Sequence, residues 1–332
     1  MELLLITKGY NIGKKIGEGG FGEVYNVMDS NNNQYALKII SNKEIASLEY
    51  NILSKLQKCK GVPTVYDFII SYESSAIIMT LLEKSVFQHF RIKKTINRLC
   101  KFAIDGLKIL KRIHRKGYLH KDIKPNQFMY PNTSHVLHLV DYNLSSKYIK
   151  QKKHIALGSS SKVVGSSMFA SLNSHRGLTL SRRDDLTSFA YTLIYLALGS
   201  LPWSPLQKYK TTKDKWKQAE RLKSQISIET LCKGLSSEFS SLLEYSTNLH
   251  FEEKPDYKFL ISSFKKLRSY HKTQQKRSIP YKINYILEIS NSQNHEEILD
   301  CKFPLKKFSY ESLDKTEEIE PPIIVRRFSD LK

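Results

Sequence analysis

The sequence has 332 residues and a formal net charge of +21, from 53 Lys and Arg against 32 Asp and Glu. This length allows one large domain or two moderate ones, and a hydrophobic content of 40% excludes a globally disordered chain. The charge predicts acidic partners, such as nucleic acid, anionic lipid or acidic proteins, without choosing among them.

Cysteine usage and apolar runs indicate the compartment. Four widely spaced cysteines include no C-x-x-C pair, which argues against a zinc site or a disulfide framework and suits a reducing environment. The apolar run at residues 3–6 is too short for the core of a signal peptide, and no stretch approaches the length of a membrane span. We therefore expect a soluble protein of the cytoplasm or nucleus.

The first part of the chain has mainly β character. Strand-forming residues bounded by glycines or polar turns predict strands at residues 10–15, 23–28, 35–40, 64–70 and 76–82. Residues 43–58 instead have helical spacing, with Ile45, Leu48, Ile52 and Leu56 on one face.

From about residue 96 the chain is mostly helical, most clearly at residues 95–115 and 184–198. A small β-rich lobe followed by a larger helical lobe is an α+β arrangement. We expect the N-lobe at residues 1–82 and the C-lobe at residues 83–288. Residues 289–332 are polar and contain a Pro-Pro pair, so we interpret them as a tail that is partly disordered.

A glycine cluster lies between the first two predicted strands. Residues 17–24, GEGGFGEV, fit the pattern G-x-G-x-x-G-x-V, in which glycines let backbone N–H groups approach phosphate oxygens. Alone the pattern is weak evidence, because an ordinary glycine-rich turn matches it more often. Strand-forming residues follow the glycines, which favours the nucleotide-binding hairpin of protein kinases over a dinucleotide-binding turn before a helix.

Lys38 ends the motif Tyr-Ala-Leu-Lys on the next predicted strand, where it could offer a point charge to the α and β phosphates of a nucleotide. By itself it could equally be a solvated strand lysine. Glu49, in the following helix, is the candidate partner that orients it, although a plain surface glutamate remains an alternative. Glu44 is a rival that leaves little chain for the helix to form first.

Residues 120–127, HKDIKPNQ, are the most informative segment, because protein kinases have H-R-D-L-x-x-x-N in their catalytic loop. In that pattern Asp122 would accept the proton of a substrate hydroxyl, and Lys124 would steady the γ-phosphate. Asp141 follows the apolar stretch LHLV, where kinases have D-F-G, and would ligate Mg²⁺ between the β and γ phosphates. The alternative for Asp141 is the cap of a turn.

Further segments resemble one kinase family specifically. Residues 164–175, VGSSMFASLNSH, resemble the activation segment of casein kinase 1, and four more segments resemble its signatures, at residues 181–186, 199–203, 228–234 and 254–257. The similarity runs from about residue 9 to about residue 288. It implies the two-lobed protein kinase fold, ATP and Mg²⁺ as cofactors, and phosphoryl transfer to Ser or Thr of acidic or already phosphorylated proteins.

The resemblance also implies roles for single residues. Met79 would guard the back of the adenine pocket, and residues 80–83 would form the hinge. Asp185 would brace the catalytic loop. Arg182 and Lys223, with Lys162 as a weaker third candidate, would bind a phosphate on the substrate. The expected ATP-binding residues are Ile16, Gly17, Gly19, Gly20, Phe21, Gly22, Val24, Ala36, Lys38, Met79, Thr80 and Leu82.

Three positions depart from the kinase pattern: Gln127 replaces the metal-binding Asn, Asn143 the glycine of D-F-G, and Lys121 the arginine of H-R-D. Gln carries the same amide oxygen as Asn on one more methylene, so we expect Gln127 to serve as a metal ligand beside Asp141. Asn is the least costly replacement if position 143 needs a left-handed backbone. Tyr142, in place of Phe, brings a hydroxyl that needs a partner.

Two other functions compete with an active kinase. A pseudokinase that binds nucleotide but turns over poorly is the first, and Gln127 is the residue that discriminates. A nucleic-acid-binding protein is the second and less favoured, because the sequence lacks zinc-ligand spacing, an aromatic RNA-binding strand and a long basic block.

Overall fold

The computed structural model describes residues 1–20, 22–92, 94–132, 134–159, 163–204, 206 and 209–276. The predicted tail at residues 289–332 and the end of the predicted C-lobe therefore lie outside the described residues, as do Phe21 and Lys162.

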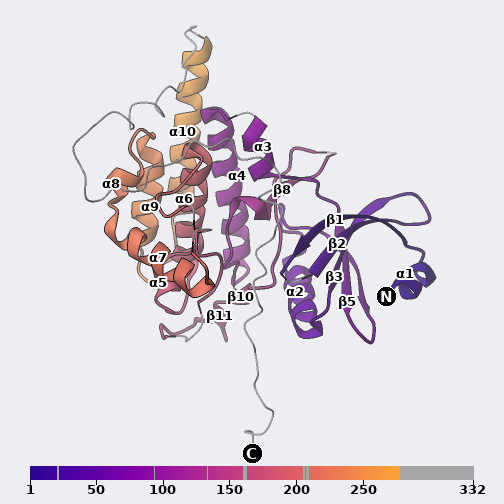
Figure 1. Ribbon diagram of the computed structural model, residues 1–332. Coiled ribbons are helices and arrows are strands. Elements are labelled where there is room, and N and C mark those ends of the chain that lie inside the picture. Colours follow the sequence, from indigo (N-terminus) through magenta and orange to yellow (C-terminus); the bar gives the residue numbers. More distant parts are fainter. Residues whose placement is uncertain are drawn as a thin grey trace, which may run out of the picture.

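The N-terminal region is built on one antiparallel sheet with strand order β1-β2-β3-β5-β4, drawn at the right of Figure 1. Its elements are α1 (Glu2–Thr7), β1 (Asn11–Gly19), β2 (Gly22–Met28), β3 (Gln34–Ile40), α2 (Lys43–Leu56), β4 (Val65–Ile70) and β5 (Ser75–Thr80). All five predicted strands and the helix are present, whereas the short helix α1 was not predicted.

Asn42 is the N-cap of helix α2, and its side chain accepts hydrogen bonds from the backbone N–H groups of Glu44 and Ile45. Such a cap satisfies N–H groups that have no partner inside the first turn. The helix buries Ile52 and Leu56, two of the predicted apolar residues, while Leu48 is exposed. The buried face packs α2 against the sheet and brings Glu49 to the sheet side.

Short strands, the helices α3 and α4 and a 3₁₀-helix follow the sheet along the chain. These elements are β6 (Lys84–Ser85), α3 (Val86–Ile92), α4 (Ile96–Arg115), β7 (Tyr118–Leu119), the 3₁₀-helix η1 (Pro125–Gln127), β8 (Phe128–Tyr130), β9 (His138–Leu139), β10 (Ser146–Lys147), β11 (Ile149–Lys150) and β12 (Lys153–His154). The catalytic-loop motif falls between β7 and β8, and Asp141 follows β9.

The remaining helices are α5 (Leu172–His175), α6 (Arg182–Leu198), α7 (Thr212–Gln225), α8 (Ile228–Leu231), α9 (Ser237–Asn248) and α10 (Tyr257–Lys276). Helix α4 packs against both α6 and α10, and α6 also packs against α9 (Figure 1). The predicted helices at 95–115 and 184–198 correspond to α4 and α6.

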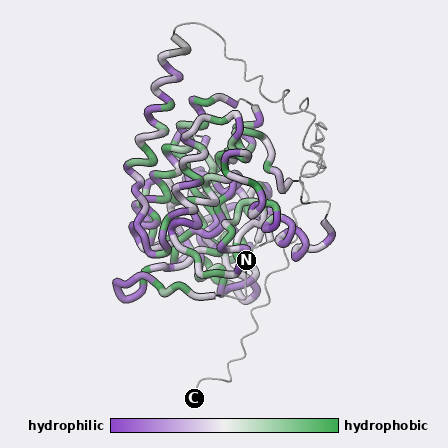
Figure 2. Tube along the Cα trace, turned by 90° about the vertical axis from the view of Figure 1, so that its left-hand side faces the viewer, coloured by the Kyte–Doolittle hydropathy of each residue, from purple (hydrophilic) through white to green (hydrophobic). Residues whose placement is uncertain are grey.

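The main hydrophobic core lies among these helices and contains the edge-to-face or tilted rings of Phe102, Phe128 and Phe189. Figure 2 shows hydrophilic and hydrophobic residues alternating along α10, the long helix that ends highest in the view, as expected for a helix with one buried face. The predicted α+β arrangement is confirmed. No helix among the described residues is long and apolar enough to cross a membrane.

Candidate active site

Strand β3 and helix α2 bring Lys38 and Glu49 together. Lys38 Nζ lies 2.8 Å from Glu49 Oε2 and 3.0 Å from Oε1, and the side chains are 12% and 1% exposed. Glu44, the rival partner, is exposed at the start of the helix. The structure therefore forms the expected pair, and Glu49 is not a surface glutamate.

The same ammonium group also contacts the segment after β9. Lys38 Nζ lies 2.8 Å from Asp141 Oδ1, and Glu49 Oε1 accepts a hydrogen bond from the Tyr142 backbone N–H. Burial alone would lower the pKa of Lys38, but the carboxylates of Asp141 and Glu49 outweigh it and hold that pKa above its usual value. Lys38 in turn keeps the pKa of Asp141 below its usual range despite burial. Burial raises the pKa of Glu49, with Lys38 opposing and Asp141 adding to the shift, so the protonation of the three groups is linked.

Asp122 and Lys124 lie next to each other in the loop before η1. Lys124 Nζ is 2.9 Å from Asp122 Oδ2. Ser166 bridges the pair, because its hydroxyl donates to Asp122 Oδ1 at 2.8 Å and accepts from Lys124 Nζ at 3.1 Å. We did not predict Ser166 as a site residue, although it stands in the family-like segment at residues 164–175.

Gly165 explains how this segment comes so close to the loop. Its φ is +95°, and a Cβ at this position would lie 2.6 Å from the backbone oxygen of Lys121. A side chain would therefore be strained and would push the segment away. The glycine lets Ser166 reach Asp122.

Asp185, on α6, holds the catalytic-loop backbone from behind. Its carboxylate accepts hydrogen bonds from the backbone N–H groups of His120 and Lys121, both at 2.8 Å. His114 Nε2 is also 2.8 Å away, so the buried carboxylate is fully partnered. These contacts fix Lys121 at a φ of +70°, a conformation that is uncommon for a residue with a side chain. Asp185 thus makes the contacts with the catalytic-loop backbone that the family resemblance implies.

Gln127 lies between the two acidic groups of the site. Its Nε2 donates to Asp141 Oδ2 at 2.9 Å and approaches Asp122 Oδ2 at 3.4 Å. Rotation of the amide by about 180° would turn Oε1 toward the Asp141 carboxylate, and the two side chains would then present oxygen atoms that can ligate a metal ion. Mg²⁺ prefers oxygen ligands and is often held by one or two protein groups together with substrate phosphates. The residues present therefore fit Mg²⁺, although no cluster of three or more His, Cys, Asp or Glu suited to a metal occurs among the described residues.

The backbone after β9 differs from our expectation at Asn143. The left-handed backbone conformation occurs at Asp141, with a φ of +67°, and not at Asn143. Position 143 therefore does not require a residue that tolerates a positive φ. Both amide atoms of Asn143 are buried without a hydrogen-bond partner in the described structure, and so is the hydroxyl of Tyr142. The described residues therefore supply no hydrogen-bond partner for the Tyr142 hydroxyl.

The glycine-rich segment forms the β1–β2 hairpin, in which Gly17 pairs with Val24 and Gly19 with Gly22. A Cβ on Gly22 would lie 2.0 Å from the backbone oxygen of Ile39, so only glycine fits. Ile16 is half-exposed on β1, and Gly20 stands at the turn.

The expected adenine-pocket residues lie on neighbouring strands. Ala36 of β3 pairs with Met79 of β5, and Val24 packs on the same apolar cluster. Thr80 ends β5, and Leu82 is buried just beyond it. The sheet thus places these residues within one region beside Lys38.

The predicted phosphate-binding pair Arg182 and Lys223 does not form an open anion site. Lys223 is 6% exposed, and its ammonium donates to the backbone oxygens of Ser167 and Ala170, both at 2.7 Å, and to His175 Nε2 at 3.0 Å. Burial holds the pKa of Lys223 well below its usual range. Lys223 is buried because α7 packs on the activation segment, and its ammonium group hydrogen-bonds to that segment instead of facing solvent.

Arg182 has different partners. Its guanidinium lies 4.8 Å from the centre of the Tyr148 ring, donates to the Tyr148 hydroxyl at 3.3 Å and donates to the backbone oxygen of Glu252. The two cations share no hydrogen-bond partner among the described residues, and their binding of a substrate phosphate stays a prediction.

Comparison with known families identifies this arrangement. A family model described as protein kinase domain matches residues 10–263. The match covers well over half of the chain, so the chain belongs to the protein kinase family.

Proposed function

We propose that this chain is an active kinase that transfers the γ-phosphoryl group of ATP to Ser or Thr of protein substrates, in the manner of casein kinase 1. The observation that carries the proposal is an unbroken chain of contacts through Glu49, Lys38, Asp141, Gln127 and Asp122. It joins the groups for nucleotide, metal and substrate across four separate segments of the fold.

In this proposal Asp122 accepts the proton of the substrate hydroxyl. The hydroxyl oxygen forms a bond to the γ-phosphorus, the bond to the β–γ bridging oxygen breaks, and ADP leaves with that oxygen. Lys124, 2.9 Å from Asp122, stabilises negative charge on the transferred group. Ser166 keeps both side chains in position before substrate binds.

Lys38 would hold the α and β phosphates of ATP, with Glu49 fixing the direction of its ammonium group. Asp141 and the Oε1 atom of Gln127 would hold Mg²⁺, which neutralises charge on the β and γ phosphates when it is bound. The choice of Ser and Thr is supported by the resemblance of residues 164–175 to casein kinase 1. A preference for acidic proteins is supported by the net charge of +21.

The test is phosphate transfer from ATP, with and without Mg²⁺, to acidic peptides that differ only in carrying Ser, Thr or Tyr. Transfer to Ser and Thr is expected, and the isosteric variant Asp122→Asn should lower the rate at least about 100-fold. Asp67→Asn, which changes a carboxylate paired with Lys8 in the N-terminal region, is the matched control and should retain the wild-type rate. A folded Asp122→Asn protein with wild-type turnover would contradict the assignment.

A pseudokinase is the second candidate, and one observation favours it. Gln127 presents its N–H group to Asp141, and the adjacent Tyr142 and Asn143 carry unpartnered polar atoms. Magnesium-dependent ATP binding without transfer to any of the three peptides would favour this function over an active kinase.

A further inference from the structure

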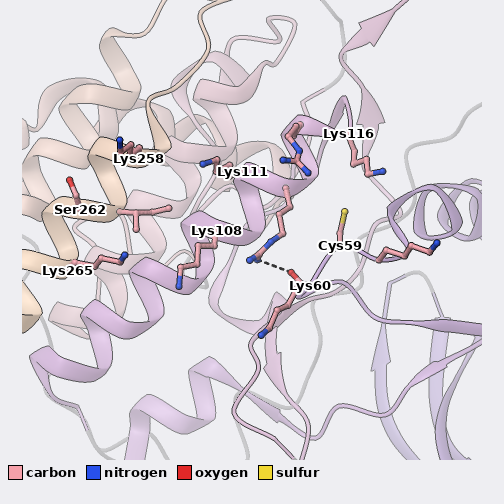
Figure 3. A pocket seen from close by; sticks show the side chains of 12 residues that line it. Cys59, Lys60, Lys108, Lys111, Lys116, Lys258, Ser262 and Lys265 are labelled. Atoms are coloured by element: carbon pink, nitrogen blue, oxygen red, sulfur yellow. Dashed lines mark hydrogen bonds between the residues drawn. The ribbon is translucent and has the colours of Figure 1, made fainter.

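A basic hollow of about 790 Å³ lies where α4, α10 and the loop after α2 meet (Figure 3). Nine of its twelve lining residues are Lys or Arg, and none is acidic. Lys108 and Lys111 come from α4, Lys258 and Lys265 from α10, and Lys58 from the loop. We call this hollow the α4–α10 groove. None of its lining residues takes part in the contacts around Lys38, Asp122 and Asp141.

The cations of the groove follow the helix faces. On α4, basic residues recur at Lys108, Lys111, Arg112 and Arg115, which is the spacing of one helix face. Figure 3 shows Lys111 of α4 and Lys265 of α10 pointing into the space between the two helices. Like charges gathered in this way repel one another, and an anion in the groove would relieve that repulsion.

A second hollow, of about 240 Å³, extends the same surface. It shares Lys111, Arg115 and Lys258 with the groove and continues to Lys254 and Arg182. Its one acidic lining residue, Asp256, accepts hydrogen bonds from the backbone N–H groups of Lys258 and Phe259 at the start of α10. The cations therefore form an elongated band, which fits an extended polyanion better than a compact one.

The lining of the band distinguishes between kinds of polyanion. Single-stranded nucleic acid is held largely by exposed aromatic rings on which bases stack. The groove has no aromatic lining residue, and Tyr148 and Tyr257 of the second hollow are buried. Cys59 and Ile261 instead add apolar side chains to the lining of the groove, which suits the occasional apolar side chain of a polypeptide.

We propose that the α4–α10 groove is a docking site for an extended acidic segment of a protein partner, including protein substrates of the kinase. The docking of substrates rests on the proposed function, whereas binding of the segment does not. The site also includes Arg182, which lines the second hollow.

Binding can be tested on the full chain by fluorescence anisotropy with a labelled Glu-rich peptide carrying one central Leu. The test variant is Lys111→Glu/Arg115→Glu/Lys258→Glu, whose three positions are exposed and line both hollows. The control Lys213→Glu/Lys217→Glu/Lys233→Glu makes the same change in net charge at exposed positions elsewhere. The test variant should lose at least about tenfold in affinity and the control less than about twofold. Thermal unfolding of both variants confirms that they fold.

Equal losses in the two variants would show attraction by net charge alone and would overturn the proposal, as would wild-type affinity in both. An oligothymidine of equal charge is the third arm. If it binds more tightly than the peptide and loses affinity in the same test variant, the groove is a nucleic-acid site and the proposal is wrong.

A kinetic arm separates docking from catalysis. A Ser peptide with the acidic segment appended should show a lower KM than the bare peptide on the wild type and the control, but not on the test variant, with kcat unchanged. Because the binding arm needs no turnover, an inactive protein that still binds the peptide through the groove would reject the proposed function and leave the docking site standing.

Discussion

The active site and helix α7 each contain a buried lysine, and the two lysines have different partners. Lys38 faces the carboxylates of Glu49 and Asp141, so its pKa is raised despite burial. Burial lowers the pKa of Lys223, because its printed partners are backbone oxygens, an imidazole nitrogen and the rings of Tyr191 and Trp203 and include no carboxylate that would offset the burial. Burial alone therefore does not identify a functional lysine. The carboxylates beside Lys38 favour its charged form, which phosphate binding needs. The hydrogen bonds from Lys223 to backbone oxygens instead hold α7 against residues 167–170.

The largest expected difference concerns catalysis. Lys38→Met should lower the rate of phosphoryl transfer at least about 100-fold, because it removes the point charge for the α and β phosphates. The rate with saturating ATP and Mg²⁺ measures this effect. Lys223→Met should leave much more of the activity, because that ammonium group does not reach the nucleotide site.

The Lys38→Met protein must be shown to fold, because the change leaves Glu49 buried without its cation, which is strongly destabilising. The double variant Lys38→Met/Glu49→Gln removes that unpaired charge and should be more stable than the single variant while remaining inactive. Near wild-type turnover in either folded protein would contradict the catalytic role of Lys38 that distinguishes it from Lys223.

Gln127 gives a smaller effect at the same site. Gln127→Ala removes an amide held by the carboxylates of Asp141 and Asp122, so about tenfold more Mg²⁺ should be needed for half-maximal transfer. Gln127→Asn, which restores the usual kinase residue, is the control and should need no more Mg²⁺ than the wild type. An unchanged Mg²⁺ dependence in Gln127→Ala would show that the amide is not a metal ligand.

The sequence predicted the parts of the site that motifs encode. Lys38, Asp122 and Asp141 are each fixed by short spacings to neighbouring residues, and the strands around the glycine hairpin follow from local pattern. The environment of Lys223 could not be predicted, because burial there depends on how α7 packs against residues distant in sequence. The bridge from Ser166 to Asp122 was missed for the same reason. The family resemblance correctly located Asp185 but not the contacts of Arg182.

The lowered pKa of Lys223 makes stability depend on pH. The unfolded chain binds a proton at this lysine up to a pH of about 10.4, whereas the folded chain releases it earlier. The unfolded state thus holds more protons in between, so folding stability rises with pH through that window, by at most about 1.4 kcal/mol per pH unit. Titrated denaturant unfolding of the wild type and Lys223→Met should show this rise only in the wild type.

His175 and Tyr191 are ionisable groups beside Lys223. Burial together with the lysine lowers the pKa of His175 to about 3, and burial raises the pKa of Tyr191. His175 therefore stays neutral and Tyr191 protonated while Lys223 titrates, and neither produces the same slope. Parallel pH profiles for the wild type and Lys223→Met would show that Lys223 is not the source.

Two buried tyrosines extend the comparison to neutral groups and give the smallest effect. Tyr142 is fully buried, and its hydroxyl has no hydrogen-bond partner in the described structure. Tyr148 is 3% exposed, but its hydroxyl donates to the backbone oxygen of His114 at 2.6 Å. Because an unpartnered buried hydroxyl forfeits its hydration without compensation, Tyr142→Phe should stabilise the fold by about 1 kcal/mol. Tyr148→Phe is the matched control and should destabilise it by about 1–3 kcal/mol, because the His114 carbonyl loses its donor. Denaturant unfolding measures both, and a loss of stability in Tyr142→Phe would mean that its hydroxyl has a partner after all.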